Sequence, residues 1–212
     1  MPRRPTRSVP TVILYGWQGS GPDHWQTWLA GQLRDADREV RYPTLPDPDH
    51  PELAAWLAAL RDTLAGLADD GFDVVAHSLG AVLWLHHAAS ERAASGAESS
   101  ERAASGAAAP PRPARVVLVA PPSPATDIPE IAPFFPLRLD VDAVRRAADG
   151  TVLVGSDNDP YTPEGIANAY GRPLKMPTTI VAGGGHLNAA AGYGEWPAML
   201  DWCRRDNLAF IA

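Results

Sequence analysis

Cysteine is nearly absent from this chain. Cys203 is the only one among 212 residues, so no disulfide bond can form within the chain. It falls in register with Trp196, Met199 and Leu200 at the i, i+3, i+4, i+7 spacing of one helix face. This spacing predicts that the thiol packs in the core and takes no part in redox or nucleophilic chemistry.

Long apolar runs are also missing. No stretch of the sequence approaches the roughly 18 to 20 apolar residues that a membrane-spanning helix needs. Residues 1–10 lack the apolar segment of a signal peptide. We therefore expect a cytoplasmic protein with no membrane partner.

The chain has no excess of positive charge. It carries 18 Lys and Arg against 25 Asp and Glu, a formal net charge of -7. Nucleic acids and anionic membranes bind clusters of basic residues, so neither is an expected partner. Arg3, Arg4 and Arg7 do form a basic tip, and residues 1–8 are predicted to be a flexible, solvated tail.

Apolar, β-branched runs alternate with helical patterns along the chain. This alternation predicts an α/β fold, with a mostly parallel central sheet and helices on both faces. The length suits a single domain, residues 1–212. The predicted strands are residues 9–15, 40–42, 73–76, 115–120, 151–155 and 178–182. The first predicted helix starts near residue 22, and the others cover residues 53–67, 79–89, 163–170 and 195–205.

One segment lies outside this pattern. Residues 90–97 and 100–107 have the same sequence, SERAASGA, and a proline-rich stretch follows at 110–113. Such a tandem duplication is too polar to bury a face of its own. We predict that residues 90–113 are a mobile insertion without a catalytic part.

The strongest local motif is Ala76-His77-Ser78-Leu79-Gly80, between a predicted strand and a predicted helix. A serine at such a strand-to-helix turn, the nucleophile elbow of a G-x-S-x-G motif, has its hydroxyl lifted clear of the backbone. Ala76 stands where the motif has its first glycine. The additional methyl group makes the match to the motif weaker but does not exclude it. The alternative is that Ser78 only caps the following helix.

A serine nucleophile needs a base, and His186 is the candidate. Of the six histidines, only His186 follows the last predicted strand, after the flexible Gly183-Gly184-Gly185. A histidine at that point can accept the proton of the serine hydroxyl during attack. The alternative is a plain glycine turn with His186 on the surface.

The acid that orients the histidine should follow the strand at 151–155. Asp157 and Asp159 both lie in the turn there, and Asp159 is our prediction because Pro160 fixes the backbone after it. Either aspartate could instead be a turn former that binds its own backbone.

The negative oxygen of an acyl-transfer intermediate requires two donors. The backbone N–H of Leu79 should be one, since it starts the helix after Ser78. The backbone N–H of Trp17, in the glycine-rich loop after the first strand, should be the other. No cofactor is expected.

These motifs together resemble one known family. The stretch from Tyr15 to Trp25, the elbow around Ser78, residues 156–160, and Gly185-His186-Leu187-Asn188 are similar to the retinoblastoma-binding protein 9/YdeN family of serine hydrolases. The resemblance implies a compact α/β-hydrolase fold without a large lid domain. It also implies a triad of Ser78, His186 and Asp159 that hydrolyses small esters, or amides as a second candidate. The family's tumour-suppressor-binding motif L-x-C-x-E is absent, so that partner is not expected.

Other functions fit the sequence less well. The order of Gly16, Gly19 and Gly21 is not the G-x-G-x-x-G of a dinucleotide site. His86 and His87 are adjacent and would point ~100° apart on a helix, so they cannot share a metal. A non-catalytic interaction protein with the same fold is the remaining alternative. The pair Phe134-Phe135 fits an acyl pocket and ordinary core equally well.

Overall fold

The computed structural model describes residues 9–67, 71–90, 112–205 and 207–210. Six strands form one sheet in the order β2-β1-β3-β4-β5-β6, and every neighbouring pair is parallel. The strands are β1 (Thr11–Leu14), β2 (Val40–Arg41), β3 (Asp73–His77), β4 (Arg115–Val119), β5 (Gly150–Ser156) and β6 (Thr178–Val181). The prediction of a parallel sheet is confirmed, and each strand begins or ends within two residues of its predicted bounds.

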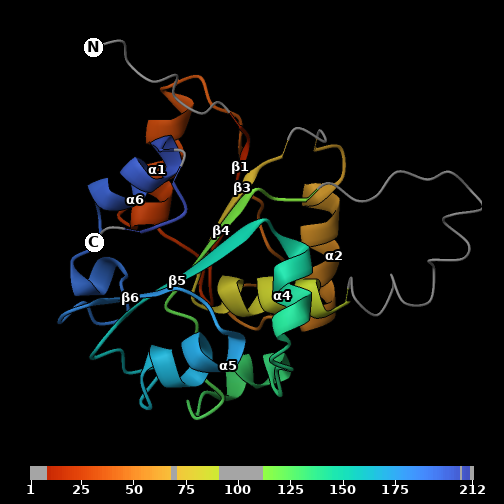
Figure 1. The fold of residues 1–212 in the computed structure, drawn as a ribbon, viewed down its shortest axis with the longest axis vertical. Helices are drawn as coiled ribbons and strands as arrows, with labels where there is room; N and C mark the ends of the chain where they lie inside the picture. The colour runs from red at the N-terminus through yellow and green to blue at the C-terminus, as the bar shows by residue number, and fades with distance from the viewer. Residues whose placement is uncertain (1–8, 68–70, 91–111, 206, 211–212) are drawn as a thin grey trace, which may run out of the picture.

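Helices cover both faces of the sheet (Figure 1). The α-helices are α1 (Trp25–Arg34), α2 (Leu53–Leu64), an unlabelled helix over residues 79–90, α4 (Val141–Ala147), α5 (Arg172–Leu174) and α6 (Pro197–Arg204). Helices α1 and α6 lie together on one face, while α2 and α4 lie on the other. Each face therefore has its own apolar core, as a doubly covered sheet requires.

The alternation of side chains along the strands divides these two cores. In β3, Val74 and Ala76 belong to the core beneath α2, while Val75 between them belongs to the core beneath α1 and α6. Trp25, Leu29 and Leu33 repeat at helical spacing and supply the buried face of α1. All three are fully buried, so this face fixes α1 against the sheet.

Two segments differ from the prediction. The helix predicted over residues 163–170 begins only after Gly165, as the π-helical turn η2 (Ala167–Gly171), which continues into α5. Gly165 has φ +81, a left-handed conformation that interrupts any helix beginning at residue 163. Between β4 and β5, where no helix was predicted, the chain forms the 3-10 helix η1 (Pro129–Phe134) and α4.

The predicted tail, residues 1–8, lies outside the described residues, as do residues 91–111 of the predicted insertion. The C-terminal end of this insertion, residues 112 and 113, packs against the rest of the domain. Pro113 is buried, and Arg112 donates hydrogen bonds to the carbonyl oxygens of Arg145 and Ala148, at 2.9 and 2.7 Å. Residues 112 and 113 are therefore part of the folded domain.

The sheet order determines where a site can form. From β1 the chain goes to β2 on one side, then crosses back to β3 on the other side of β1. The loops after β1 and β3 therefore leave the sheet in opposite directions, and a crevice opens between them at the carboxyl edge. These loops contain Trp17 and Ser78. In the described residues, no helix is long and apolar enough to cross a membrane.

Candidate active site

Ser78 lies on a strained turn at the carboxyl end of β3. Its φ is 54°, in the left-handed region that non-glycine residues rarely adopt. The Ser78 N–H donates to the carbonyl oxygen of Val119, 2.8 Å away at the end of β4, and the 79–90 helix follows at once. A conformation of this kind costs of order 1–3 kcal/mol and persists only where the surrounding structure imposes it. The turn presents the hydroxyl to the crevice.

Two glycines allow the chain to pass close to this turn. A Cβ atom on Gly80 would lie 2.6 Å from the carbonyl oxygen of Leu14, so β1 leaves no room for a side chain. A Cβ atom on Gly16 would lie 2.6 Å from the Cβ of Ser78 and 3.0 Å from the nitrogen of Leu79. At the first motif position, Ala76 pairs with Leu14 in the sheet, and its methyl group is buried in the core.

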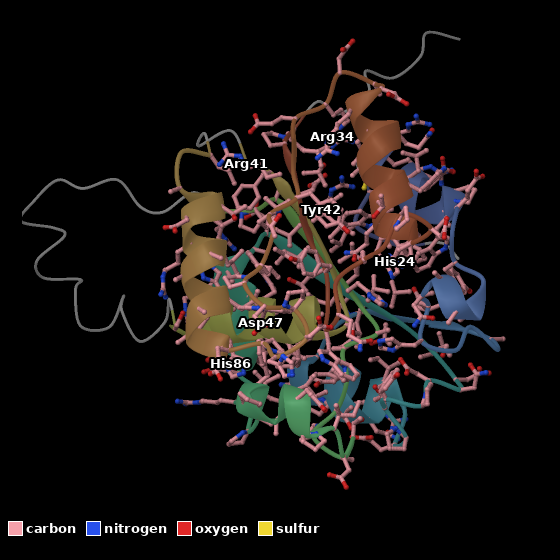
Figure 2. The ribbon with its side chains drawn as sticks, turned by 180° about the vertical axis from the view of Figure 1, so that it is seen from behind. His24, Arg34, Arg41, Tyr42, Asp47 and His86 are labelled. Carbon is pink, nitrogen blue, oxygen red and sulfur yellow. The ribbon has the colours of Figure 1, made fainter. Side chains whose placement is uncertain are left out.

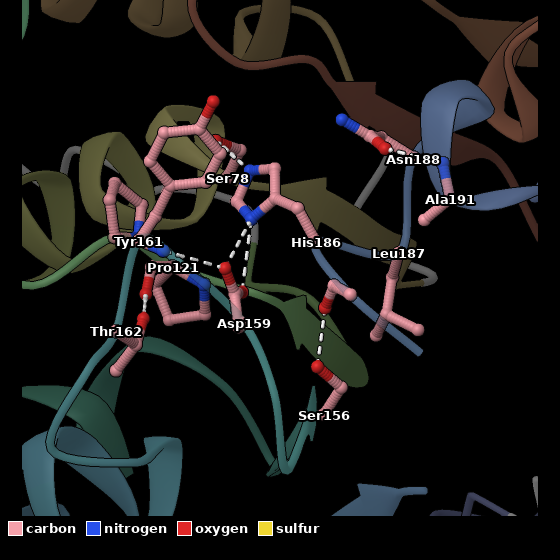
Figure 3. Close-up of polar contacts among 12 residues, drawn as sticks. Ser78, Pro121, Ser156, Asp159, Tyr161, Thr162, His186, Leu187, Asn188 and Ala191 are labelled. Carbon is pink, nitrogen blue, oxygen red and sulfur yellow. Dashed lines mark hydrogen bonds and ion pairs between the residues drawn. The ribbon is translucent and has the colours of Figure 1, made fainter. Parts of the chain in front are cut away.

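Ser78, His186 and Asp159 form a continuous hydrogen-bonded chain (Figure 3). His186 Nε2 lies 2.9 Å from Ser78 Oγ, and His186 Nδ1 lies 3.0 Å from both carboxylate oxygens of Asp159. A carboxylate only accepts hydrogen bonds, so Nδ1 carries the proton of the neutral ring and Nε2 is free to accept from the serine hydroxyl. The side chains of His186 and Asp159 are buried. The imidazole is thus held in the tautomer that can take a proton from Ser78.

Asp157 lies elsewhere. Its Oδ1 accepts a hydrogen bond from the Gly183 N–H at 2.7 Å, and Asn158 Oδ1 accepts one from the Gly185 N–H at 2.7 Å. The Ser156 hydroxyl donates to the Gly185 carbonyl oxygen. These side chains connect the loop after β5 to the glycine loop that carries His186, a role that was not predicted for Asn158 or Ser156.

The two predicted oxyanion donors lie beside the serine. Leu79 is the first residue of its helix, where an N–H has no partner within the helix. Trp17 is held by its own side chain, whose Nε1 donates to the Asp49 carbonyl oxygen at 2.9 Å, and by Gln18, whose N–H donates to the Pro48 carbonyl oxygen at 2.8 Å. Among the described residues, neither the Trp17 nor the Leu79 N–H has a protein acceptor.

Sequence comparison decides the family. A family model described as serine hydrolase matches residues 11–205. The chain belongs to this family. Among curated proteins, none matches the chain.

Solved structures show the same fold. The YdeN gene product of B. subtilis is 20% identical over 91% of this chain and 95% of its own, with a TM-score of 0.71. A YdeN-like hydrolase from Pectobacterium atrosepticum is 22% identical over 92% of this chain and 89% of its own, with a TM-score of 0.62. Est1E from Butyrivibrio proteoclasticus is 15% identical over 94% and 87%, with a TM-score of 0.61. The YdeN-type resemblance is supported, while similarity to retinoblastoma-binding protein 9 stays a prediction.

Two further histidines of this serine hydrolase adjoin the site, and sequence reasoning missed both. His77 Nε2 lies 3.0 Å from the His186 carbonyl oxygen, and its ring centroid is 5.0 Å from the rings of both His186 and His24. Burial lowers the pKa of His77 well below its usual value, and burial lowers the pKa of His24 to about 4. Both rings are therefore neutral at pH 7. Their positions in the sequence could have indicated them. His77 directly precedes Ser78, and His24 lies in the stretch from Tyr15 to Trp25 that resembles the family.

A cavity of about 160 Å³ opens beside Ser78. Its walls come from the loops after β1, β3, β4, β5 and β6, and the lining residues are Gly16, Trp17, Gln18, Gly19, His24, His77, Ser78, Leu79, Pro122, Ile128, Ile131, Tyr161, His186 and Asn188. Phe134 is instead buried in the core against Trp56, with ring centroids 5.3 Å apart. Ile128 and Ile131 line the cavity, and neither Phe134 nor Phe135 does. Within the described residues, no group of three or more His, Cys, Asp or Glu could hold a metal ion.

Proposed function

We propose that this serine hydrolase cleaves small carboxylic esters, with amides as the second candidate substrates, through Ser78, His186 and Asp159. The observation that carries the proposal is the hydrogen-bonded chain from Asp159 through His186 to Ser78 Oγ, at 3.0 and 2.9 Å. A free serine hydroxyl is a weak nucleophile, and a base within hydrogen-bonding distance is what activates it.

The first half of the reaction forms an acyl-enzyme. Ser78 Oγ attacks the ester carbonyl carbon while its proton passes to His186 Nε2. The new Oγ–C bond makes a tetrahedral intermediate, whose negative oxygen accepts hydrogen bonds from the Trp17 and Leu79 N–H groups. The bond to the leaving alcohol then breaks, and His186 returns the proton to that oxygen.

The second half releases the acid. Water attacks the acyl carbon, gives its proton to His186 Nε2, and the bond to Ser78 Oγ breaks as the serine regains a proton. Asp159 stabilises the imidazolium in both halves. The Tyr161 N–H donates to Asp159 Oδ1 at 2.9 Å, which holds the carboxylate in place beneath the imidazole.

The Ser78→Ala variant tests this proposal. It should fold normally but lose hydrolysis of p-nitrophenyl acetate by at least about a thousandfold, together with labelling by a fluorophosphonate probe. Only an activated serine reacts with such a probe, so a wild-type protein that is neither labelled nor active would support the alternative of a non-catalytic interaction protein. Labelling that persists in Ser78→Ala would place the nucleophile at another serine.

A further inference from the structure

The cavity beside Ser78 carries no fixed charge. None of its lining residues is Lys, Arg, Asp or Glu; the groups that can ionise there are three histidines and Tyr161. A carboxylate, phosphate or ammonium group that entered this cavity would lose hydration without gaining a counter-charge. The lining therefore favours substrates that are uncharged around the scissile bond.

His24 gives this cavity a polar point at a fixed position. It is the N-cap of α1 (Figure 2). Its Nδ1 accepts a hydrogen bond from the Gln26 N–H at 3.2 Å. The ring also packs against Trp25 and His77, with centroids 5.5 and 5.0 Å away. By contrast, Gln18, another polar lining residue, is exposed. His24 is only 7% exposed, so its ring is held where a binding group needs to be rigid.

The hydrogen bond to Gln26 also determines which nitrogen donates. Because Nδ1 accepts, the proton of the neutral ring lies on Nε2. The low pKa of His24 keeps the ring neutral while His186 gains and loses its proton nearby. His24 therefore presents one N–H donor without a charge.

That donor is available to a ligand. Among the described residues, His24 Nε2 makes no hydrogen bond, and it is not one of the fully buried side-chain atoms that lack one. His24 lines the cavity, and Nε2 is the ring nitrogen that makes no hydrogen bond to the protein.

We propose that the substrate is an uncharged ester with a second hydrogen-bond-accepting oxygen beyond the scissile ester group, and that this oxygen binds His24 Nε2–H. The inference rests on the proposed function, since it places the second oxygen relative to an ester attacked by Ser78. The apolar residues Leu79, Ile128 and Ile131 contact the hydrocarbon part of the same substrate.

Matched ester pairs test the second oxygen. p-Nitrophenyl methoxyacetate and p-nitrophenyl butyrate have acyl groups of nearly equal size and differ by an ether oxygen. 2-Methoxyethyl acetate and butyl acetate make the same comparison in the alcohol. The measured quantity is the ratio of kcat/KM within each pair, compared between wild type and variants so that the intrinsic reactivity of each ester cancels.

Two variants of His24 separate binding from helix capping. His24→Gln retains an N–H near the position of Nε2 but loses the Nδ1 acceptor, while His24→Asn retains a capping acceptor but loses the outward donor. For at least one pair, the ratio should fall about three- to tenfold in His24→Asn and stay within about twofold of wild type in His24→Gln. His86→Asn, a histidine outside the cavity, should leave both ratios unchanged.

The outcomes distinguish this proposal from the function on which it rests. If wild type hydrolyses the esters through Ser78 but both ratios in His24→Asn equal those of wild type, the role of His24 is overturned and the proposed function stands. Lower thermal stability in His24→Gln, together with wild-type ratios in His24→Asn, would make His24 a helix cap only. If wild type hydrolyses none of the four esters, the proposed function falls and the inference falls with it.

A charged ester tests the inference that the cavity selects uncharged substrates. The mono-p-nitrophenyl ester of succinic acid carries a free carboxylate, and its kcat/KM should be at least about tenfold lower than that of the butyrate. Equal hydrolysis of the two would overturn the inference that the cavity selects uncharged substrates.

Discussion

His77 Nε2 donates a hydrogen bond to the carbonyl oxygen of His186, 3.0 Å away and 109 residues later in the chain. A carbonyl oxygen only accepts, so the neutral His77 ring carries its proton on Nε2. The residue before the proposed nucleophile thereby binds the backbone of the proposed base. The distance between Ser78 and His186 then depends on this contact as well as on their own hydrogen bond.

We expect His77→Leu to lower kcat by about ten- to a hundredfold with little change in KM, because a base displaced by a fraction of an ångström no longer meets the serine hydroxyl. His77→Gln, which can donate at a similar distance, should recover most of the loss. Steady-state kinetics and thermal unfolding of both variants make the test.

His86→Leu is the matched control for this prediction. His86 Nε2 makes the same kind of bond, to the Phe134 carbonyl oxygen at 2.8 Å, but away from the triad. If the two leucine variants lose equal activity, or if His77→Gln is no better than His77→Leu, then His77 does not position the base.

The two aspartates after β5 should behave differently on substitution. Asp159→Asn removes the charge that stabilises the imidazolium and disturbs the tautomer, so kcat should fall by at least about a hundredfold. Asp157→Asn keeps an oxygen for the Gly183 N–H and should cost less than about tenfold. Steady-state kinetics on the two purified variants decides the assignment. A larger loss in Asp157→Asn would mean that the acid is Asp157.

Sequence alone predicted the parts of the fold that local patterns determine. β-branched runs identify buried strands, and the chain order of strand, serine and helix places Ser78 at an elbow. The choice between Asp157 and Asp159 was harder, because both lie in one turn and only the contact with the distant His186 separates them. Residue spacing left that choice open.

Tertiary contacts explain what was missed. The helix predicted at residue 163 starts later because Gly165 adopts a positive φ, a conformation that the sequence permits but does not require. His24 ends the loop after β1 and His77 is the last residue of β3, and only the return of the chain from β2 to β3 across β1 brings their rings together. No local pattern contains that proximity.

Buried neutral histidines should make the protein sensitive to acid. The pKa values of His24 and His87 are lowered by burial to about 4, below the value of about 6.5 in an unfolded chain. Below pH 6.5 the unfolded state therefore binds protons that the folded state does not. The free energy of unfolding should fall as the pH drops from about 6.5 to about 4, by up to about 3 kcal/mol for each of these two groups.

His87→Met isolates one part of this effect. The Nδ1 atom of His87 is buried without a partner, so an apolar side chain of similar size should fit. Denaturant titrations give the free energy of unfolding at about pH 7 and about pH 5. The decrease between these two pH values should be about 2 kcal/mol smaller in His87→Met than in wild type. An equal loss in both proteins would mean that His87 titrates normally in the folded state.

The last prediction concerns Asp73, at the opposite end of β3 from Ser78. Its side chain is fully buried; Arg115 Nε donates to its Oδ1 at 3.1 Å, and an Arg115 terminal nitrogen donates to its Oδ2. Arg38 lies 3.8 Å from the same carboxylate. Replacing the aspartate by alanine leaves two buried guanidinium groups without this negative charge. Asp73→Ala should therefore lower the free energy of unfolding by about 3–5 kcal/mol.

Activity separates this structural role from the catalytic one. The carboxylate lies at the amino end of the strand, so the folded fraction of Asp73→Ala should retain the kcat of wild type. Titration with a fluorophosphonate probe counts the folded, reactive sites, and kcat per labelled site is then compared at a temperature well below the melting point. Asp73→Asn keeps one hydrogen-bond-accepting oxygen but loses the negative charge. Its stability should therefore lie between those of wild type and Asp73→Ala. A kcat per site lowered more than about tenfold would show that the ion pair also acts on the geometry of the Ser78 turn, because a small displacement of catalytic groups has a large effect on rate.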